Sequence, residues 1–162
     1  MAEAYAGLRE MVFTTTPLSI GLKPAADEVW GVVMETGYPK AVASLVALAD
    51  GTVSLYFSNG GGIIGLGPHP EPNRLGKELI TSAQRFVTQA KLTKVYPLPQ
   101  PIYTRFYLLT GNGVVTVEAK EDDLGNQRNS FSPLFYKAQD LISAIRVVDE
   151  QRNVKSGGVA GH

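Results

Sequence analysis

Residues that could do chemistry gather in one glycine-rich segment, which reads SNGGGIIGLGPHPEP over 58–72. Its Gly60-x-Gly62-x-x-Gly65 spacing matches a dinucleotide-binding fingerprint. Glycines in such a loop let backbone N–H groups approach a ligand phosphate closely, and a nearby cation adds favourable charge. The segment therefore predicts an anion as the ligand, if it binds one. The candidate contacts are Asn59, Gly60, Gly61, Gly62, His69 and Arg74.

The nucleotide interpretations of this segment fail on the residues that follow it. In a dinucleotide site the third glycine lies in the opening turn of a helix, but Pro68, Pro70 and Pro72 follow Gly65 closely. A proline inside a helix costs about 3 kcal/mol, so no helix runs through the motif. A Walker loop fails because Pro68 stands where the lysine is required. We therefore interpret the segment as a structural connector, with an anion or partner contact as the alternative.

Other catalytic and metal-binding patterns are missing from the sequence. His69 is the only internal histidine and the chain has no cysteine, so a His/Cys zinc site cannot be built. The acidic run at 121–123 does not supply the alternating oxygen ligands of a calcium loop. A histidine base also needs an orienting partner, which the sequence does not display. We expect no metal and no cofactor, and the sequence favours a non-catalytic protein without deciding the point.

A second group of residues predicts a contact surface. Tyr103, Arg105 and Tyr107 alternate along one predicted strand, so they share a face that the core does not use, and Tyr56 extends this face. Tyrosine and arginine are enriched where interfaces bury most of their binding energy. We take these four residues as a candidate interface. The alternative is an exposed sheet face with a cross-strand contact between Arg105 and Glu118.

The elements that position these residues are three helices and five strands. Apolar residues recur every three or four positions from Leu75 to Ala90, which predicts a helix capped by Asn73. Ser132 as N-cap and Pro133 at the first helical position predict the start of the last helix. We expect helices over 2–12, 75–90 and 133–150, and strands over 29–35, 41–49, 52–58, 102–109 and 114–120.

Two turn signals predict the pairing of the hairpins. Asp50-Gly51 favours a two-residue turn, which places Leu48 opposite Val53 and the alanine-rich alternate positions on the other face. Asn112-Gly113 similarly places Leu108 opposite Val117 on the core side. Register matters because a shift of one residue moves every side chain to the other face.

The expected fold is α+β, with the element order α-β-β-β-α-β-β-α. Hairpins predict an antiparallel sheet of about five strands, and helices packed on it make a two-layer sandwich. We expect one domain over 1–150 and a flexible, glycine-rich tail over 151–162. The element order loosely resembles that of profilin-like and Roadblock-like small α/β regulators, a resemblance of fold that no motif residue carries.

Composition limits the partners and the location. The 162 residues contain 15 basic and 15 acidic side chains, so no net charge draws the chain to nucleic acid or an anionic membrane. No apolar run approaches the ~20 residues of a membrane helix, and the start Met1-Ala-Glu-Ala shows no signal peptide. We expect a cytoplasmic protein.

Three functional hypotheses follow. The first is a non-catalytic protein-interaction or regulatory module, expected to be a homodimer or to bind a protein partner. The second is a small-anion sensor or enzyme with its pocket at 58–72, where a helix N-terminus and glycine amides would favour negative charge. The third is an inhibitor or immunity-type protein, which shares the sequence features of the first.

Overall fold

The computed structural model describes residues 2–63 and 65–160, with side chains as far as residue 152. It is an α+β fold with one antiparallel sheet of seven strands, in the order β4-β3-β2-β1-β6-β7-β5. The strands are β1 (Val29–Gly37), β2 (Val42–Leu48), β3 (Val53–Phe57), β4 (Gly62–Ile63), β5 (Lys91–Thr93), β6 (Tyr103–Thr110) and β7 (Gly113–Lys120). The helices are α1 (Glu3–Thr14), α2 (Pro70–Ala83), α3 (Glu121–Gly125) and α4 (Ser132–Ala160), with 3-10 turns η1 (Pro17–Ile20) and η2 (Gln84–Gln89).

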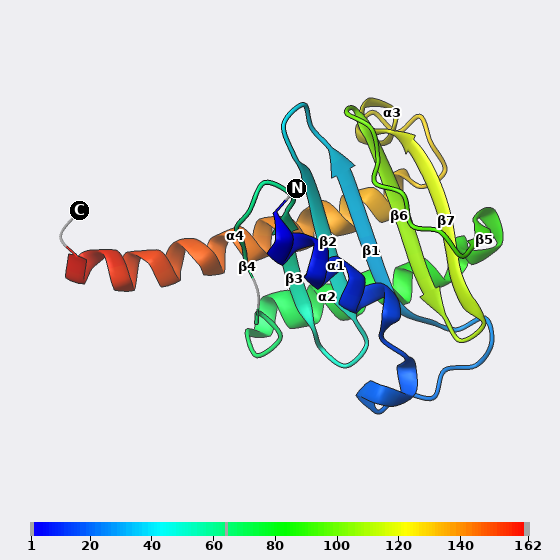
Figure 1. Cartoon of the computed structure of the whole chain (residues 1–162), viewed down its shortest axis with the longest axis horizontal. Coiled ribbons are helices and arrows are strands. Elements are labelled where there is room, and N and C mark those ends of the chain that lie inside the picture. Colours follow the sequence, from blue (N-terminus) through cyan, green and yellow to red (C-terminus); the bar gives the residue numbers. More distant parts are fainter. Residues whose placement is uncertain (1, 64, 161–162) are drawn as a thin grey trace.

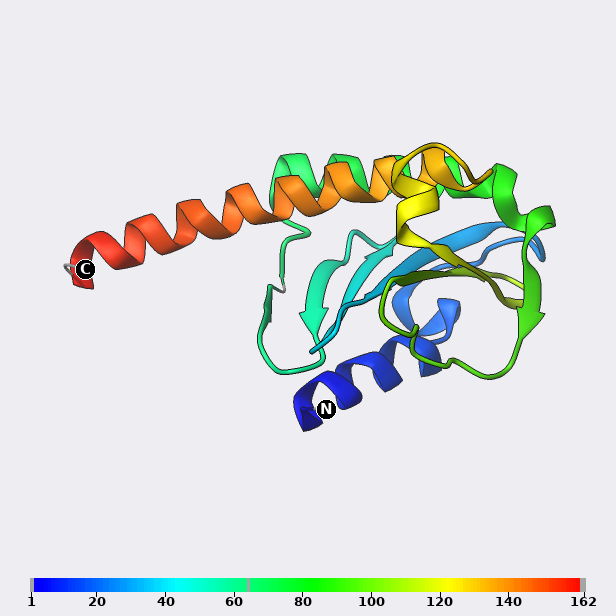
Figure 2. The same ribbon diagram turned by 90° about the horizontal axis from the view of Figure 1, so that it is seen from above.

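The helices lie on both faces of the sheet. Figure 2 shows α2 and α4 side by side on one face and α1 on the other. The expected two layers are therefore three, and the expected five strands are seven because β4 and β5 extend the two edges of the sheet. The likeness to profilin-like regulators stays a comparison of element order. Among the described residues, no helix combines the length and the apolar character needed to cross a membrane.

The central strand β1 explains why both faces are covered. All nine of its residues are buried, because apolar side chains occupy both the odd and the even positions. Val32 and Met34 pack toward α2 and α4, whereas Trp30 and Val33 belong to a second apolar cluster that includes Tyr5 of α1. A strand that is apolar on both sides needs a layer on each.

The first hairpin differs from its predicted register by one residue. Val53 pairs with Ala47 and not with Leu48, so Leu45 and Ala47 face α2 and α4 while Val46 faces α1. The cause is a three-residue loop over 49–51, closed by the hydrogen bond from Leu48 N to Thr52 O and ended by Gly51 in the left-handed region. The prediction that Leu48 and Val46 face the main core and that the alanine-rich positions face away from it was therefore wrong.

The second hairpin turns one residue earlier than expected. Thr110 pairs with Gly113, so the turn is Gly111-Asn112 and Leu108 lies opposite Val115. This shift changes the pairing by two positions, which keeps every side chain on its predicted face. Leu108 accordingly belongs to the core beneath α2 and α4.

Helix boundaries also depart from the prediction. The middle helix begins at Pro70, with prolines in its first turn, so Asn73 is not its cap; the Asn73 side chain instead donates to Gly67 O at 2.9 Å. Ser132 is the first residue of α4 and its Oγ has no hydrogen-bond partner within the described part of the chain, so the predicted cap is absent.

The last helix is longer than expected. It continues through 151–160, where we expected a tail, and projects beyond the sheet (Figure 1). The flexibility predicted for this segment stays a prediction, and residues 161–162 of the predicted tail lie outside the described residues.

Candidate functional site

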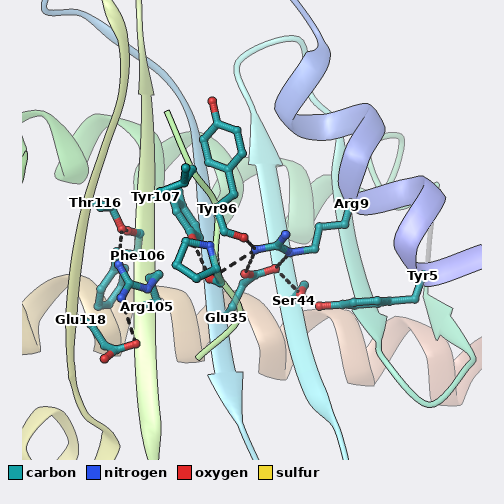
Figure 3. A network of polar contacts seen from close by, with 12 residues as sticks. Tyr5, Arg9, Glu35, Ser44, Tyr96, Arg105, Phe106, Tyr107, Thr116 and Glu118 are labelled. Atoms are coloured by element: carbon teal, nitrogen blue, oxygen red, sulfur yellow. Dashed lines mark hydrogen bonds and ion pairs between the residues drawn. The ribbon is translucent and has the colours of Figure 1, made fainter. Parts of the chain in front are cut away.

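The sheet face beneath α1 carries a row of polar side chains that crosses four strands. Glu35 of β1 pairs with Ser44 of β2 on one side and with Arg105 of β6 on the other, and Arg105 pairs with Glu118 of β7. Paired residues in neighbouring antiparallel strands share a face and lie side by side. Figure 3 shows this row with α1 above it, and we call it the polar row.

Glu35 is the centre of the polar row. Its side chain is fully buried, yet both carboxylate oxygens accept hydrogen bonds. Arg9 of α1 donates from Nε at 2.9 Å and from Nη2 at 2.8 Å, and Ser44 Oγ donates at 2.7 Å. This two-pronged arginine contact is the strong, directional form of an ion pair. Arg9 Nη2 also donates to Tyr96 O at 2.6 Å, which ties the segment before β6 to the same cluster.

Burial changes the acid–base properties of the surrounding side chains. Burial, followed by the charge of Glu35, raises the pKa of both Tyr5 and Tyr107 to about 12. The Tyr5 hydroxyl lies 2.7 Å from Ser44 Oγ, and the Tyr107 hydroxyl donates to Pro97 O. Burial alone would lower the pKa of Arg9, but its hydrogen bonds and attraction to Glu35 outweigh this and raise it. Both phenols are therefore neutral at neutral pH, and the arginine stays charged.

This chemistry suits attachment better than catalysis. A general base must reach a proton on its substrate, whereas the Glu35 carboxylate is sealed from solvent and engaged on both oxygens. Within the described ranges, no group of three or more acidic or histidine side chains could hold a metal ion. The polar row fastens α1 to the sheet at a defined position.

The structure places the four candidate interface residues on this same face but leaves only part of it open. Tyr56 and Tyr107 are 5% and 0% exposed, because they belong to the apolar cluster that α1 helps to form. Neither side chain is therefore accessible to a partner in this structure. Tyr103 and Arg105 remain partly exposed, and Arg105 forms the alternative cross-strand contact, at 3.2 Å from Glu118. A partner contact at this face stays a prediction.

The glycine-rich segment does not bring its candidate ligand residues together. Gly62 pairs with Tyr56 at one end of β3, and the chain then runs back along β3 until Leu66 N donates to Val53 O at the other end. Gly60 and Gly61 adopt positive φ in the tight turn, which agrees with a structural connector. The glycine amides and the His69 region therefore lie at opposite ends of β3. Residue 64 lies outside the described residues.

Two further candidates, His69 and Arg74, already have partners within the chain. Arg74 contacts the carboxylates of Glu71 at 2.6 Å and Glu78 at 3.2 Å, all on the exposed side of α2. His69 Nε2 lies 3.2 Å from Arg152 Nη2, so it contacts α4. The arrangement gives an incoming anion no convergent set of donors from the predicted residues.

A hollow at the end of β1 is a site that sequence reasoning missed. It has a volume of about 550 Å³, and its walls include Tyr38, Pro39, Ile102, Glu121, Phe135 and Gln139. Tyr38 is 47% exposed and Ile102 is 60% exposed. Burial, followed by the charge of Glu121, raises the pKa of Tyr38. We call this site the Ile102 hollow.

The backbone of Ile102 is strained. Its φ is 72°, in a region that β-branched residues rarely adopt. Two backbone hydrogen bonds hold it there: Ile102 N donates to Gly37 O at 3.0 Å, and Glu121 N donates to Ile102 O at 2.8 Å. Nothing in the sequence near 102 indicates this conformation, because isoleucine normally signals an extended strand.

The sequence also did not lead us to predict a role for Glu35, Arg9 or Ser44. The available signal was a single glutamate in the otherwise apolar stretch VWGVVMETG, which a strand buried on both faces does not tolerate without a cation. Comparison with known proteins finds no matching family model, no matching curated protein and no matching solved structure.

Proposed function

We propose that this chain is a non-catalytic protein-interaction or regulatory module that acts as a homodimer through the Ile102 hollow. The observation that supports this is the exposure of the strained Ile102 side chain beside that of Tyr38. The polar row agrees with a non-catalytic role, because its acidic and basic groups are engaged with one another. A cytoplasmic location, expected from the sequence by elimination, belongs to the same proposal.

The strain at Ile102 is the main support. A non-glycine residue held in such a conformation costs of order 1–3 kcal/mol, and such residues cluster at functional sites. Burial in the chain's own core does not offset this cost, because most of the isoleucine side chain is exposed. Contact with a second molecule would bury it. Exposed apolar groups that lie together are typical of interaction surfaces.

The surroundings of the hollow favour a second copy of the chain as the partner. An apolar side chain, Ile102, stands beside a hollow on the same surface, so two copies related by a two-fold axis could each insert it into the other. One opposite pair of charges lies at the hollow. Lys40, next to the wall residue Pro39, and the wall residue Glu121 form no ion pair among the described residues, whereas Asp122 is already paired with Arg128.

Sedimentation velocity tests the proposal. Ile102→Asn removes the apolar side chain and relieves the strain, because asparagine tolerates positive φ. We expect the wild type to sediment as a dimer and this variant as a folded monomer. The matched control is Leu18→Asn, since Leu18 is 70% exposed in η1, at the opposite end of the sheet (Figure 1). A monomeric wild type, or a variant that dimerises equally well, would refute the proposal.

The alternatives have less support. An anion sensor or enzyme at 58–72 needs donors that converge, and the glycine amides and Arg74 lie far apart along β3 and α2. An inhibitor or immunity-type protein would use the same exposed surface toward a different chain. It predicts a monomeric wild type, so the same sedimentation experiment separates it from the homodimer.

A further inference from the structure

A second hollow lies on the helical side of the sheet, between the end of α2 with η2 and the start of α4. Its volume is about 520 Å³. Its walls include the side chains of Thr81, Ser82, Arg85, Phe86, Pro133 and Lys137. No wall residue of this hollow is acidic, and none belongs to the Ile102 hollow.

The two cations of this hollow, like the described lysines elsewhere in the chain, lack the carboxylate partner that four of its arginines have. Arg85 and Lys137 form no ion pair within the described part of the chain. The Arg85 guanidinium instead lies over the ring of Phe86, 4.8 Å from its centre. By contrast, a carboxylate lies within 3.2 Å of each of Arg9, Arg74, Arg105 and Arg128. Two uncompensated positive charges on one concave surface favour an anion there.

The remaining walls supply further contacts of two kinds. The hydroxyls of Thr81 and Ser82 can donate to an oxyanion, and the hollow lies at the N-terminal end of the long helix α4, where the helix dipole favours negative charge. Pro133 supplies the exposed part of an apolar floor, beneath which Phe86 and Leu134 are buried. The hollow therefore offers a cationic side for an oxyanion and an apolar side for a carbon framework.

The wall that carries Arg85 is fixed in place before any ligand arrives. The neighbouring Gln84 side chain accepts from Val29 N at 2.9 Å and donates to Asp27 O at 2.8 Å, which ties η2 to the start of β1. A preformed wall loses less conformational entropy on binding. From these observations we infer that this hollow binds a small organic oxyanion, a phosphate or carboxylate attached to an aromatic or aliphatic body.

Calorimetric titration with phenyl phosphate at about 0.15 M salt tests the inference, since this ionic strength screens attraction that is merely long-range. We expect one molecule to bind per chain, with chemical-shift changes in the amides of 81–86 and 134–137. Arg85→Gln and Lys137→Gln should each weaken binding at least about tenfold. Lys77→Gln, which removes an exposed charge from α2 outside the hollow, should leave binding unchanged.

The inference would be overturned by a wild type that does not bind, by equal weakening in Lys77→Gln, or by shift changes confined to other residues. Inorganic phosphate and phenol test the two halves of the ligand, and each should bind at least about tenfold more weakly than phenyl phosphate. If inorganic phosphate binds as tightly, the apolar floor contributes nothing and the proposed ligand class is wrong. If phenyl phosphate binds more tightly than both, its affinity compared with that of benzoate shows whether the hollow prefers a phosphate or a carboxylate.

Discussion

The two faces of the sheet hold their helices by different means. The face toward α2 and α4 is a continuous apolar cluster, and α2 alone buries five of its residues. The face toward α1 is smaller, and α1 buries only Tyr5 and Val12. Glu35, the one fully buried charged side chain among the described residues, lies on this second face and is held by α1.

The two kinds of contact have different effects: apolar burial stabilises the fold, whereas the ion pair sets the position of α1. Apolar burial is non-directional, so a large apolar face holds its helices strongly but permits small shifts. A buried ion pair adds little net stability, because desolvation offsets much of the attraction, but it has a strict geometry. We infer that α2 and α4 are held by the apolar surface that they bury against the sheet. The ion pair between Arg9 and Glu35 instead fixes where the short helix α1 lies.

The largest effect is expected on the apolar face. Phe106 is fully buried there, with its ring 5.5 Å from that of Phe131. Phe106→Ala should lower the free energy of unfolding by about 4 kcal/mol, because it removes buried apolar area and leaves a cavity. Urea unfolding followed by circular dichroism measures it. A loss below about 1 kcal/mol would contradict the view that buried apolar surface supplies most of the stability on this face.

The next effect concerns the ion pair under α1. Arg9→Met leaves the Glu35 carboxylate buried without its cation and should cost about 3 kcal/mol in the same measurement. The double variant Arg9→Met with Glu35→Leu should regain most of this loss, because no buried charge then remains. A double variant as unstable as the single one would show that the arginine acts through packing and not through charge.

The sequence predicted the hairpins and the three main helices because their signals are local. Turn residues and apolar periodicity act within a few positions of the chain. Asp50-Gly51 was misassigned because aspartate and glycine suit a two-residue turn and also the end of a three-residue loop. The edge strands β4 and β5 were missed because two or three residues, such as Gly62–Ile63, show no alternation.

The polar row is a non-local property and could not be read from the sequence in the same way. Arg105 was identified by residue type, but its place beside Glu35 depends on pairing between β1 and β6, which lie far apart in the sequence. Glu35 joins that row only because β1 lies between β2 and β6. The cover formed by α1 depends in turn on which face this short helix packs against, which its own weak periodicity does not decide.

A smaller effect is expected at alkaline pH, and on the α1 face it arises from Tyr5 and Tyr107. The pKa values of Tyr5 and Tyr107 are about 12 in the folded chain and about 10 when exposed. Folding therefore disfavours their ionisation, so stability that is complete below pH 10 is lost as the pH rises through 12. Urea midpoints between pH 8 and 12 should fall over this interval. Tyr5→Phe should flatten the fall; a midpoint that stays constant to pH 12 would contradict the burial of these phenols.

The smallest effect is expected at the uncovered end of the polar row, where Arg105 pairs with Glu118. These side chains are 19% and 30% exposed, so water screens their attraction, and Arg105 Nε has no partner within the described residues. Arg105→Met should therefore change the free energy of unfolding by only about 0.5 kcal/mol. The Arg9 and Arg105 side chains are similarly exposed, at 15% and 19%, but Glu35 is fully buried whereas Glu118 is 30% exposed. If Arg105→Met costs as much as Arg9→Met, burial of the paired carboxylate is not what makes the Arg9 contact decisive.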